Sequence, residues 1–123
     1  MTETRKIDLR TTYCVEDCLS KSVVDKYKAM GLPVLLELVE TKPFFCEGGS
    51  YKGEKAELLL DGCHRSRALF DLGHYIIRII HDEWDIGQEV LGPLVSKAKI
   101  LEQPEYNRWY KETYDEPANP NWK

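Results

Sequence analysis

Residues 57–73, "ELLLDGCHRSRALFDLG", contain the stretch that decides the fold. An apolar run leads into Gly62, and a segment whose apolar residues have helical spacing then reaches Gly73. Glycine lets the backbone turn sharply between a strand and a helix, and it also commonly ends a helix. The stretch therefore predicts a buried strand, a tight turn and a helix of about ten residues.

The periodicity of apolar residues predicts further strands and one helix around this unit. Alternation predicts a strand over residues 6–9, a nearly uninterrupted apolar run predicts a buried strand over residues 34–39, and β-branched content predicts a strand over residues 74–80. A helix is expected between the first two strands, with Ser20 as its N-cap and Gly31 closing it.

Two intervening segments lack a clear period. Residues 11–21 are polar and predict a turn region, and residues 41–55, which are rich in Gly and Lys, predict a loop or an irregular hairpin. Residues 85–103 have helical spacing and predict a helix kinked at Gly92–Pro93. A second helix is expected to begin with Pro104 in its first turn.

The resulting order is β-α-β-β-α-β followed by helices, which indicates a single α+β domain with a small mixed sheet. Its expected parts are a core over residues 1–84 and a C-terminal helical extension over residues 85–123, packed on the same domain.

Composition narrows the class of protein. The chain has 123 residues, 42% hydrophobic and 31% charged, as is typical of a globular domain that buries a real core. The net charge of −4 argues against broad nucleic-acid binding, which needs a cationic surface. No apolar run approaches the roughly 20 residues of a membrane helix, and the charged N-terminal residues do not resemble a secretory signal. We therefore expect no membrane partner, a cytoplasmic location and reduced cysteines.

The junction after Gly62 combines features that suit an anion. The first turn of a helix offers backbone N–H groups and the positive end of a dipole. Arg65 and Arg67 add guanidinium donors, His64 adds a donor or proton shuttle, and Cys63 gains thiolate character beside these cations. The alternative is purely structural, with Gly62 making the turn, Cys63 packed in the core and the arginines solvated.

The segment "LLLDGCHRSRALFDLGHYIIRI" resembles the signature of the ParB/sulfiredoxin superfamily, in which a strand runs through glycine and a His-Arg pair into a helix, a glycine and another strand. Upstream, "KIDL" and "KAMGLPVLLELVE" resemble that family's first strand, helix and second strand, so the resemblance covers roughly residues 6–80. It implies a nucleotide-binding fold whose phosphate site lies at residues 62–67.

The sulfiredoxin branch matches Gly62, Cys63, His64 and Arg65 one by one. The resemblance implies ATP-phosphate binding by this tetrapeptide and thiol chemistry at Cys63, as in reduction of a cysteine sulfinate. It also implies nucleotide contacts from the preceding helix, where the corresponding or neighbouring positions are Lys21, Ser22 and Lys26. Leu60-Asp61 departs from the aromatic residue and glycine of sulfiredoxins, which puts the reductase activity in doubt.

The free-serine kinases of the superfamily have an aspartate where this chain has Asp61. That resemblance implies Mg²⁺ held by Asp61 beside the phosphates of ATP, and phosphoryl transfer with Glu16 as base. Those kinases are about twice as long and often have histidine at the position of Cys63. The ParB branch implies nucleotide-dependent DNA binding, which the acidic charge and the lack of an evident recognition helix after Ile80 disfavour.

Other residues leave alternatives open. Cys14, Cys18, Cys46 and the Cys63-His64 pair could form a zinc site, and a Cys14–Cys18 or Cys14–Cys46 disulfide is an equal alternative. His74 and His81 are interpreted as strand-end residues. Aromatic residues gather near the C-terminus, either in the core or at a protein-partner or homodimer surface: Trp84, Tyr106, Trp109, Tyr110 and Trp122. The leading hypothesis is an ATP-binding enzyme of phosphoryl transfer or ATP hydrolysis, and its rival is a non-catalytic, nucleotide-gated binding module.

Overall fold

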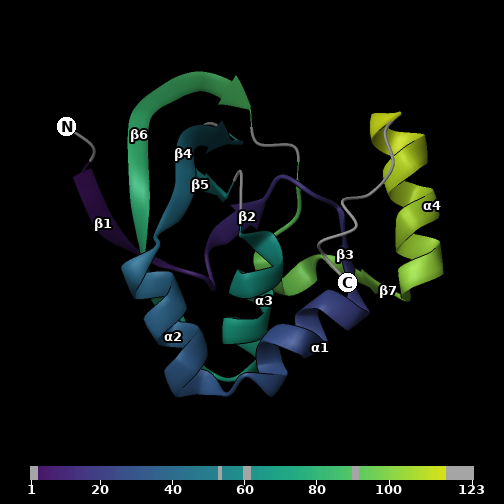
Figure 1. Cartoon of the computed structure of the whole chain (residues 1–123). Coiled ribbons are helices and arrows are strands. Elements are labelled where there is room, and N and C mark those ends of the chain that lie inside the picture. Colours follow the sequence, from purple (N-terminus) through teal and green to yellow (C-terminus); the bar gives the residue numbers. More distant parts are fainter. Residues whose placement is uncertain (1–2, 53, 60–61, 90–91, 116–123) are drawn as a thin grey trace.

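The computed structural model describes residues 3–52, 54–59, 62–89 and 92–115. In chain order its elements are β1 (Glu3–Asp8), β2 (Thr12–Cys14), β3 (Cys18–Ser20), α1 (Lys21–Ala29), α2 (Leu32–Thr41), β4 (Phe44–Tyr51), β5 (Glu54–Leu59), α3 (Cys63–Asp71), β6 (Ile76–Glu89), the 3₁₀ turn η1 (Val95–Lys97), β7 (Lys99–Leu101) and α4 (Gln103–Tyr114) (Figure 1). The protein is an α+β domain, as the sequence predicts.

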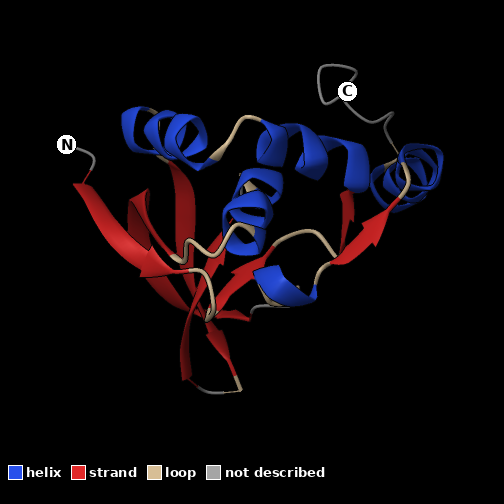
Figure 2. Cartoon of the chain, turned by 90° about the horizontal axis from the view of Figure 1, so that it is seen from below, coloured by secondary structure: helices blue, strands red, loops and turns tan. Residues whose placement is uncertain are grey.

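Five strands form a mixed sheet in the order β1-β6-β4-β5-β2. β1 pairs antiparallel with β6 and β4 pairs antiparallel with β5, whereas the β6–β4 and β5–β2 pairs are parallel. A separate two-stranded sheet pairs β3 with β7 in parallel. The helices lie on one side of the strands, and α3 lies in the middle, beneath α1 and α2 (Figure 2).

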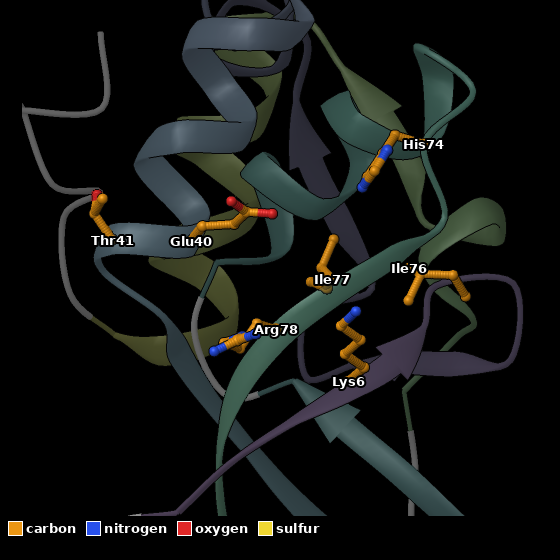
Figure 3. Close-up of a pocket in the computed structure, with 7 residues that line it drawn as sticks. All are labelled: Lys6, Glu40, Thr41, His74, Ile76, Ile77 and Arg78. Atoms are coloured by element: carbon orange, nitrogen blue, oxygen red, sulfur yellow. The ribbon is translucent and has the colours of Figure 1, made fainter.

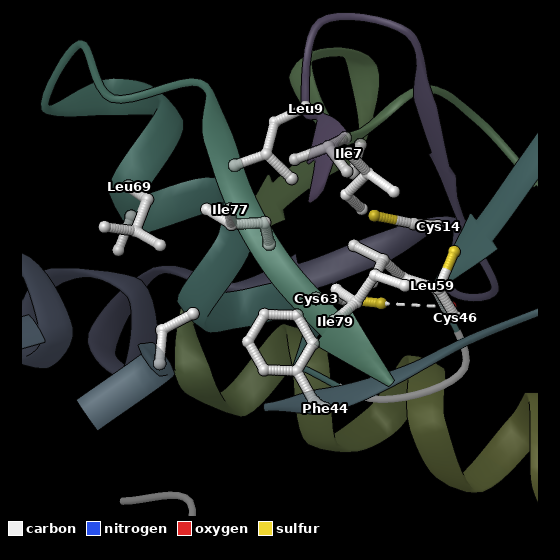
Figure 4. Close-up of a cluster of buried hydrophobic side chains, with 14 of the residues drawn as sticks. Ile7, Leu9, Cys14, Phe44, Cys46, Leu59, Cys63, Leu69, Ile77 and Ile79 are labelled. Atoms are coloured by element: carbon white, nitrogen blue, oxygen red, sulfur yellow. Dashed lines mark hydrogen bonds between the residues drawn. The ribbon is translucent and has the colours of Figure 1, made fainter. Parts of the chain in front are cut away.

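The core lies between α3 and the central strands. Cys46 and Cys14 are both register partners of Leu59, so the three side chains form one row across β4, β5 and β2. All three are fully buried, and the first residue of α3, Cys63, packs on this row (Figure 4). The N-terminal end of α3 is therefore anchored to the sheet.

Several predicted elements are confirmed. Strands occur at residues 3–8, 54–59 and from Ile76 onward, and the segment over residues 41–55 contributes to the hairpin of β4 and β5. α1 begins after Ser20, whose side chain accepts a hydrogen bond from the Val23 N–H. α3 ends before Gly73, which has a φ of +83°, and α4 has Pro104 in its first turn.

The strand predicted over residues 34–39 is wrong, because this segment lies within α2. Pro33 occupies the first turn of the helix and Gly31 precedes it with a φ of +85°. Leu35 and Val39 are fully buried at helical spacing, whereas Val34 is 54% exposed. The apolar run is therefore buried on one face only, and its leucines are good helix formers.

The helix predicted over residues 85–103 is also wrong. β6 continues to Glu89, so the expected division at residue 84 falls inside a strand, and β7 follows where the helix was expected to end. Pro93 accepts a hydrogen bond from the Cys14 N–H at 2.7 Å, and a Cβ on Gly92 would lie 1.7 Å from the Cys14 oxygen. Gly92–Pro93 thus pass close to β2 and do not kink a helix. The segment over residues 11–21, expected to be a turn region, contains β2 and β3.

Within the described ranges, no helix has the length and apolar character needed to cross a membrane.

Candidate phosphate site at the start of α3

Gly62 makes the turn into α3 with a φ of +79°, in the left-handed region. A Cβ at this position would lie only 2.5 Å from the ring of Phe44, so the ring packs directly against the glycine backbone. The Arg65 guanidinium lies over the same ring, 4.6 Å from the ring centroid. α3 has no acidic residue in its first turn, so no carboxylate of that turn opposes the positive end of the helix dipole.

The start of α1 lies beside the start of α3. The Ser20 N–H donates to Nε2 of His64 at 3.0 Å, and at the far ends of the two helices Lys28 pairs with Asp71 at 3.5 Å. The starts of α1 and α3 therefore lie together, as do their ends, so the two helices are parallel. Their positive dipole ends converge on one region.

Cys63 and His64 are both buried. The Cys63 thiol donates to the Leu59 carbonyl at 3.6 Å and lies next to Cys14, whose pKa it raises together with burial. Burial lowers the pKa of His64 to about 4, so the imidazole is neutral near pH 7. With Nε2 accepting from Ser20, His64 fixes the two helix starts relative to each other and supplies no positive charge.

The other predicted cations have different partners. Arg67 donates to the carbonyls of Ala98 at 2.9 Å and Val95 at 3.3 Å and pairs with Asp71, so it ties α3 to η1. Lys21 pairs with Asp25 at 2.7 Å. Arg65 is the predicted arginine whose guanidinium remains beside the turn.

Ser22 and Lys26 are exposed on α1, one helical turn apart. The Ser22 hydroxyl donates to Oε1 of Gln103 at 2.5 Å, and the Ser20 hydroxyl donates to the same oxygen. Gln103 is the first residue of α4, so its side-chain amide oxygen connects the start of α4 to the start of α1. The sequence analysis did not single out Gln103, because only the fold brings it to this position.

Glu16 lies in the loop between β2 and β3 and is 9% exposed. Its carboxylate accepts a hydrogen bond from the Tyr106 hydroxyl at 3.4 Å, and the Tyr106 ring lies edge-on to His64 with centroids 5.5 Å apart. Tyr106 is completely buried, and burial with the nearby Glu16 raises its pKa. The fold thus connects Glu16 to His64 through Tyr106. Asp61 lies outside the described residues.

The aromatic residues of α4 extend from this contact. Rings of Tyr106, Trp109, Tyr110 and Tyr114 pack on one another with centroid separations between 4.6 and 6.3 Å. Only Tyr106 is completely buried, while Tyr114 is 39% exposed. Core packing therefore accounts for the first turn of α4, and the ring cluster reaches the surface at its last turn. Trp122 lies outside the described residues, as does the side chain of Trp84.

The four cysteines are free thiols. The alternative Cys14–Cys46 disulfide is wrong, because β5 lies between their strands. Two strand spacings separate the Cα atoms by about 9.5 Å, beyond the ~7 Å limit of a disulfide. Among the described residues, no group of three His, Cys, Asp or Glu side chains could hold a metal ion.

No protein-family model matches the sequence, and no curated protein matches it. Among solved structures, the chain is similar to protein Atu1540 from Agrobacterium tumefaciens, with 13% identity and a TM-score of 0.49. The similarity covers 71% of this chain and 44% of that one, so the present chain matches less than half of Atu1540.

Together, these contacts define a positively polarised region at the paired starts of α1 and α3. Two helix dipoles, the backbone at Gly62 and the Arg65 guanidinium can all act on one anion. The first turn of α4 lies against the same region through Gln103 and Tyr106.

Proposed function

We propose that the protein binds ATP, or a related nucleotide, with the phosphates at the start of α3. The observation that carries this proposal is the convergence of the α1 and α3 starts, joined by the Ser20–His64 hydrogen bond, beside the left-handed turn at Gly62. Phosphate oxygens suit such a place, because backbone N–H groups and aligned dipoles stabilise negative charge. Arg65 would add a guanidinium contact to the phosphates.

The α1 side chains fit a role along the phosphate chain. Ser22 and Lys26 lie on the same exposed face, and Lys21 lies in the first turn with Asp25 as its ion-pair partner. Arg67 is better explained as a structural residue, since its donors are taken by Val95, Ala98 and Asp71. Mg²⁺, if it accompanies the nucleotide, would be held through Asp61 and would neutralise phosphate charge.

Phosphoryl transfer or ATP hydrolysis would use Glu16 as base or Cys63 as nucleophile. The Cys63 residue is 5% exposed and its thiol is directed at a carbonyl of β5, and Glu16 is held by Tyr106. Of these two residues, Glu16 is the better candidate for a catalytic role, because its carboxylate can accept a proton and lies beside the Tyr106 hydroxyl of α4. A role in the cytoplasm would fit the four reduced cysteines.

A non-catalytic, nucleotide-gated binding module is the second candidate, and one observation favours it. Gln103 accepts hydrogen bonds from Ser20 and Ser22, so a phosphate at the start of α1 would compete with α4 for the same donors. Nucleotide binding would then change the position of α4 and of its aromatic cluster, which would contact a protein partner or a second copy of this chain.

Isothermal titration calorimetry with Mg-ATP tests the binding proposal. Wild-type protein should bind, and Arg65→Ala should weaken binding by about tenfold, as expected for loss of a charge-assisted hydrogen bond. Arg10→Ala is the matched control, because Arg10 also lies over an aromatic ring, 5.0 Å from that of Tyr75. Wild-type protein that does not bind the nucleotide would refute the proposal.

Release of ADP separates the candidates. Turnover that is lost in Glu16→Gln or Asp61→Asn and kept in Cys63→Ser indicates kinase-like chemistry, and the reverse indicates thiol chemistry. Binding without turnover, together with a change in tryptophan fluorescence that is lost in Trp109→Phe, indicates the binding module.

A further inference from the structure

A pocket lies at the opposite end of α3 from the proposed phosphate site. Its volume is about 530 Å³, in the range of small-molecule sites. Glu40 lines it from the last turn of α2, His74 from the loop after α3, and Lys6 and Arg78 from β1 and β6 (Figure 3). Nothing in the proposed nucleotide site uses these residues.

Two of the pocket's cations are forced together by the sheet. Lys6 and Arg78 are direct register partners in the antiparallel β1–β6 pair, so their side chains leave the same face. Partners of this kind have Cβ atoms roughly 5 Å apart, and like charges there are destabilising. On the same strand Arg5 is neutralised by Glu57, but neither Lys6 nor Arg78 forms an ion pair or side-chain hydrogen bond within the described chain.

The pocket also exposes part of a strand edge. Pairing of β4 with β6 begins at Phe44 and Ile79, so within the described residues no strand covers that edge of residues 76–78. Ile76 and Ile77 line the pocket at this edge. A ligand there would meet the exposed side chain of Ile76, backbone hydrogen-bonding groups and the two cations.

We propose that this pocket binds a small-molecule anion with two or more negative charges, carried on phosphate or carboxylate groups. A dianion would relieve the repulsion between Lys6 and Arg78, and His74 would add a third nitrogen donor. Among the described residues that line the pocket, Glu40 is the single acid, so this lining is net positive in a chain whose overall charge is −4. The cationic patch is small and local, which suits a metabolite rather than a nucleic acid, since a nucleic acid needs an extended cationic surface.

Nuclear magnetic resonance titration with sodium pyrophosphate, and separately with sodium citrate, tests this proposal at low ionic strength. Amide shifts at residues 76–78 report on the pocket, and shifts at residues 63–65 report on the proposed nucleotide site. We expect saturable shifts at residues 76–78 with at least one probe. Binding of pyrophosphate alone would identify a phosphate ligand, citrate alone a carboxylate ligand, and both a site that recognises charge.

The variants decide whether the cations are responsible. Lys6→Gln and Arg78→Gln should each weaken pocket binding about threefold to fivefold, as expected for partly exposed charge pairs, and Glu40→Gln should strengthen it. Lys111→Gln, on exposed α4, removes the same charge and should have no effect. The proposal is overturned if neither probe shifts residues 76–78, if Lys6→Gln and Arg78→Gln bind normally, or if Glu40→Gln binds more weakly. Shifts confined to residues 63–65 would overturn it while supporting the nucleotide site.

Discussion

Replacement of Gly62 by alanine should destabilise the protein by about 2 to 5 kcal/mol, from two separate causes. The φ of +79° places any residue with a Cβ in the left-handed region, which costs about 1–2 kcal/mol. The new methyl group would also lie 2.5 Å from the Phe44 ring, and such overpacking typically costs about 1–3 kcal/mol. Phe44 is 2% exposed, so its ring has little room to move away.

Urea unfolding measured by circular dichroism gives the two costs separately when Gly73→Ala is measured beside Gly62→Ala. Gly73 has nearly the same φ, +83°, but no atom outside its chain neighbours lies within 4 Å of the position that a Cβ would take, so this control should lose only about 1–2 kcal/mol. Adding Phe44→Leu should recover part of the Gly62→Ala loss as a favourable coupling energy. Equal losses in the two glycine variants would refute the reasoning that the ring and the glycine backbone are in contact.

Three further changes test other contacts. His64→Gln keeps an acceptor for the Ser20 backbone N–H but cannot titrate. The pKa of His64 is about 4 in the folded protein against an ordinary value of 6.5, so the free energy of unfolding of the wild type should fall by up to roughly 3 kcal/mol as the pH drops from 6.5 to 4. This part of the pH dependence should be absent in the variant. Arg67→Ala should lower the free energy of unfolding by about 1–3 kcal/mol while leaving the affinity for Mg-ATP unchanged, measured by denaturation and calorimetry; an affinity loss equal to that of Arg65→Ala would contradict its structural role. Tyr106→Phe should cost about 1 kcal/mol through the lost bond to Glu16 and Tyr106→Ala about 3–5 kcal/mol, so similar values for both would contradict the burial of the ring.

Local signals were sufficient where a turn or cap is encoded in neighbouring residues. The Ser20 cap, the glycines after α1 and α3, and Pro104 in the first turn of α4 all occur as the sequence predicts. These features depend on backbone preferences within one helical turn, so they do not require knowledge of the rest of the fold.

Contacts between residues far apart in the sequence account for the two segments whose secondary structure was predicted wrongly. The run over residues 34–39 is as compatible with a half-buried helix as with a strand, and only its position over the sheet decides between them. The periodicity after Asp85 looks helical, but pairing with β4 on one side continues β6 to Glu89. Tertiary contacts therefore override a weak local preference in both segments.

The candidate site divides in the same way. Residues 62–65 and 20–22 stand out in the sequence, but nothing in it indicates that His64 accepts a hydrogen bond from Ser20 or that Gln103 reaches Ser22. In each of these two pairs, the residues are more than forty positions apart along the chain, so no rule of local spacing connects them. Arg65 and Arg67 look equivalent in sequence, and only the fold gives them different partners.

The pairing of β3 with β7 has a consequence for how the protein is made. Ser20 is the register partner of Leu101, so the strand that leads into α1 has no partner until residues 99–101 have been synthesised. β1 likewise waits for β6, and β2 waits for β5. Contacts so distant in sequence slow folding and leave strand edges exposed while the chain is incomplete. A nascent chain that stops before β7 should therefore be recognised by chaperones, because β3 has no partner strand.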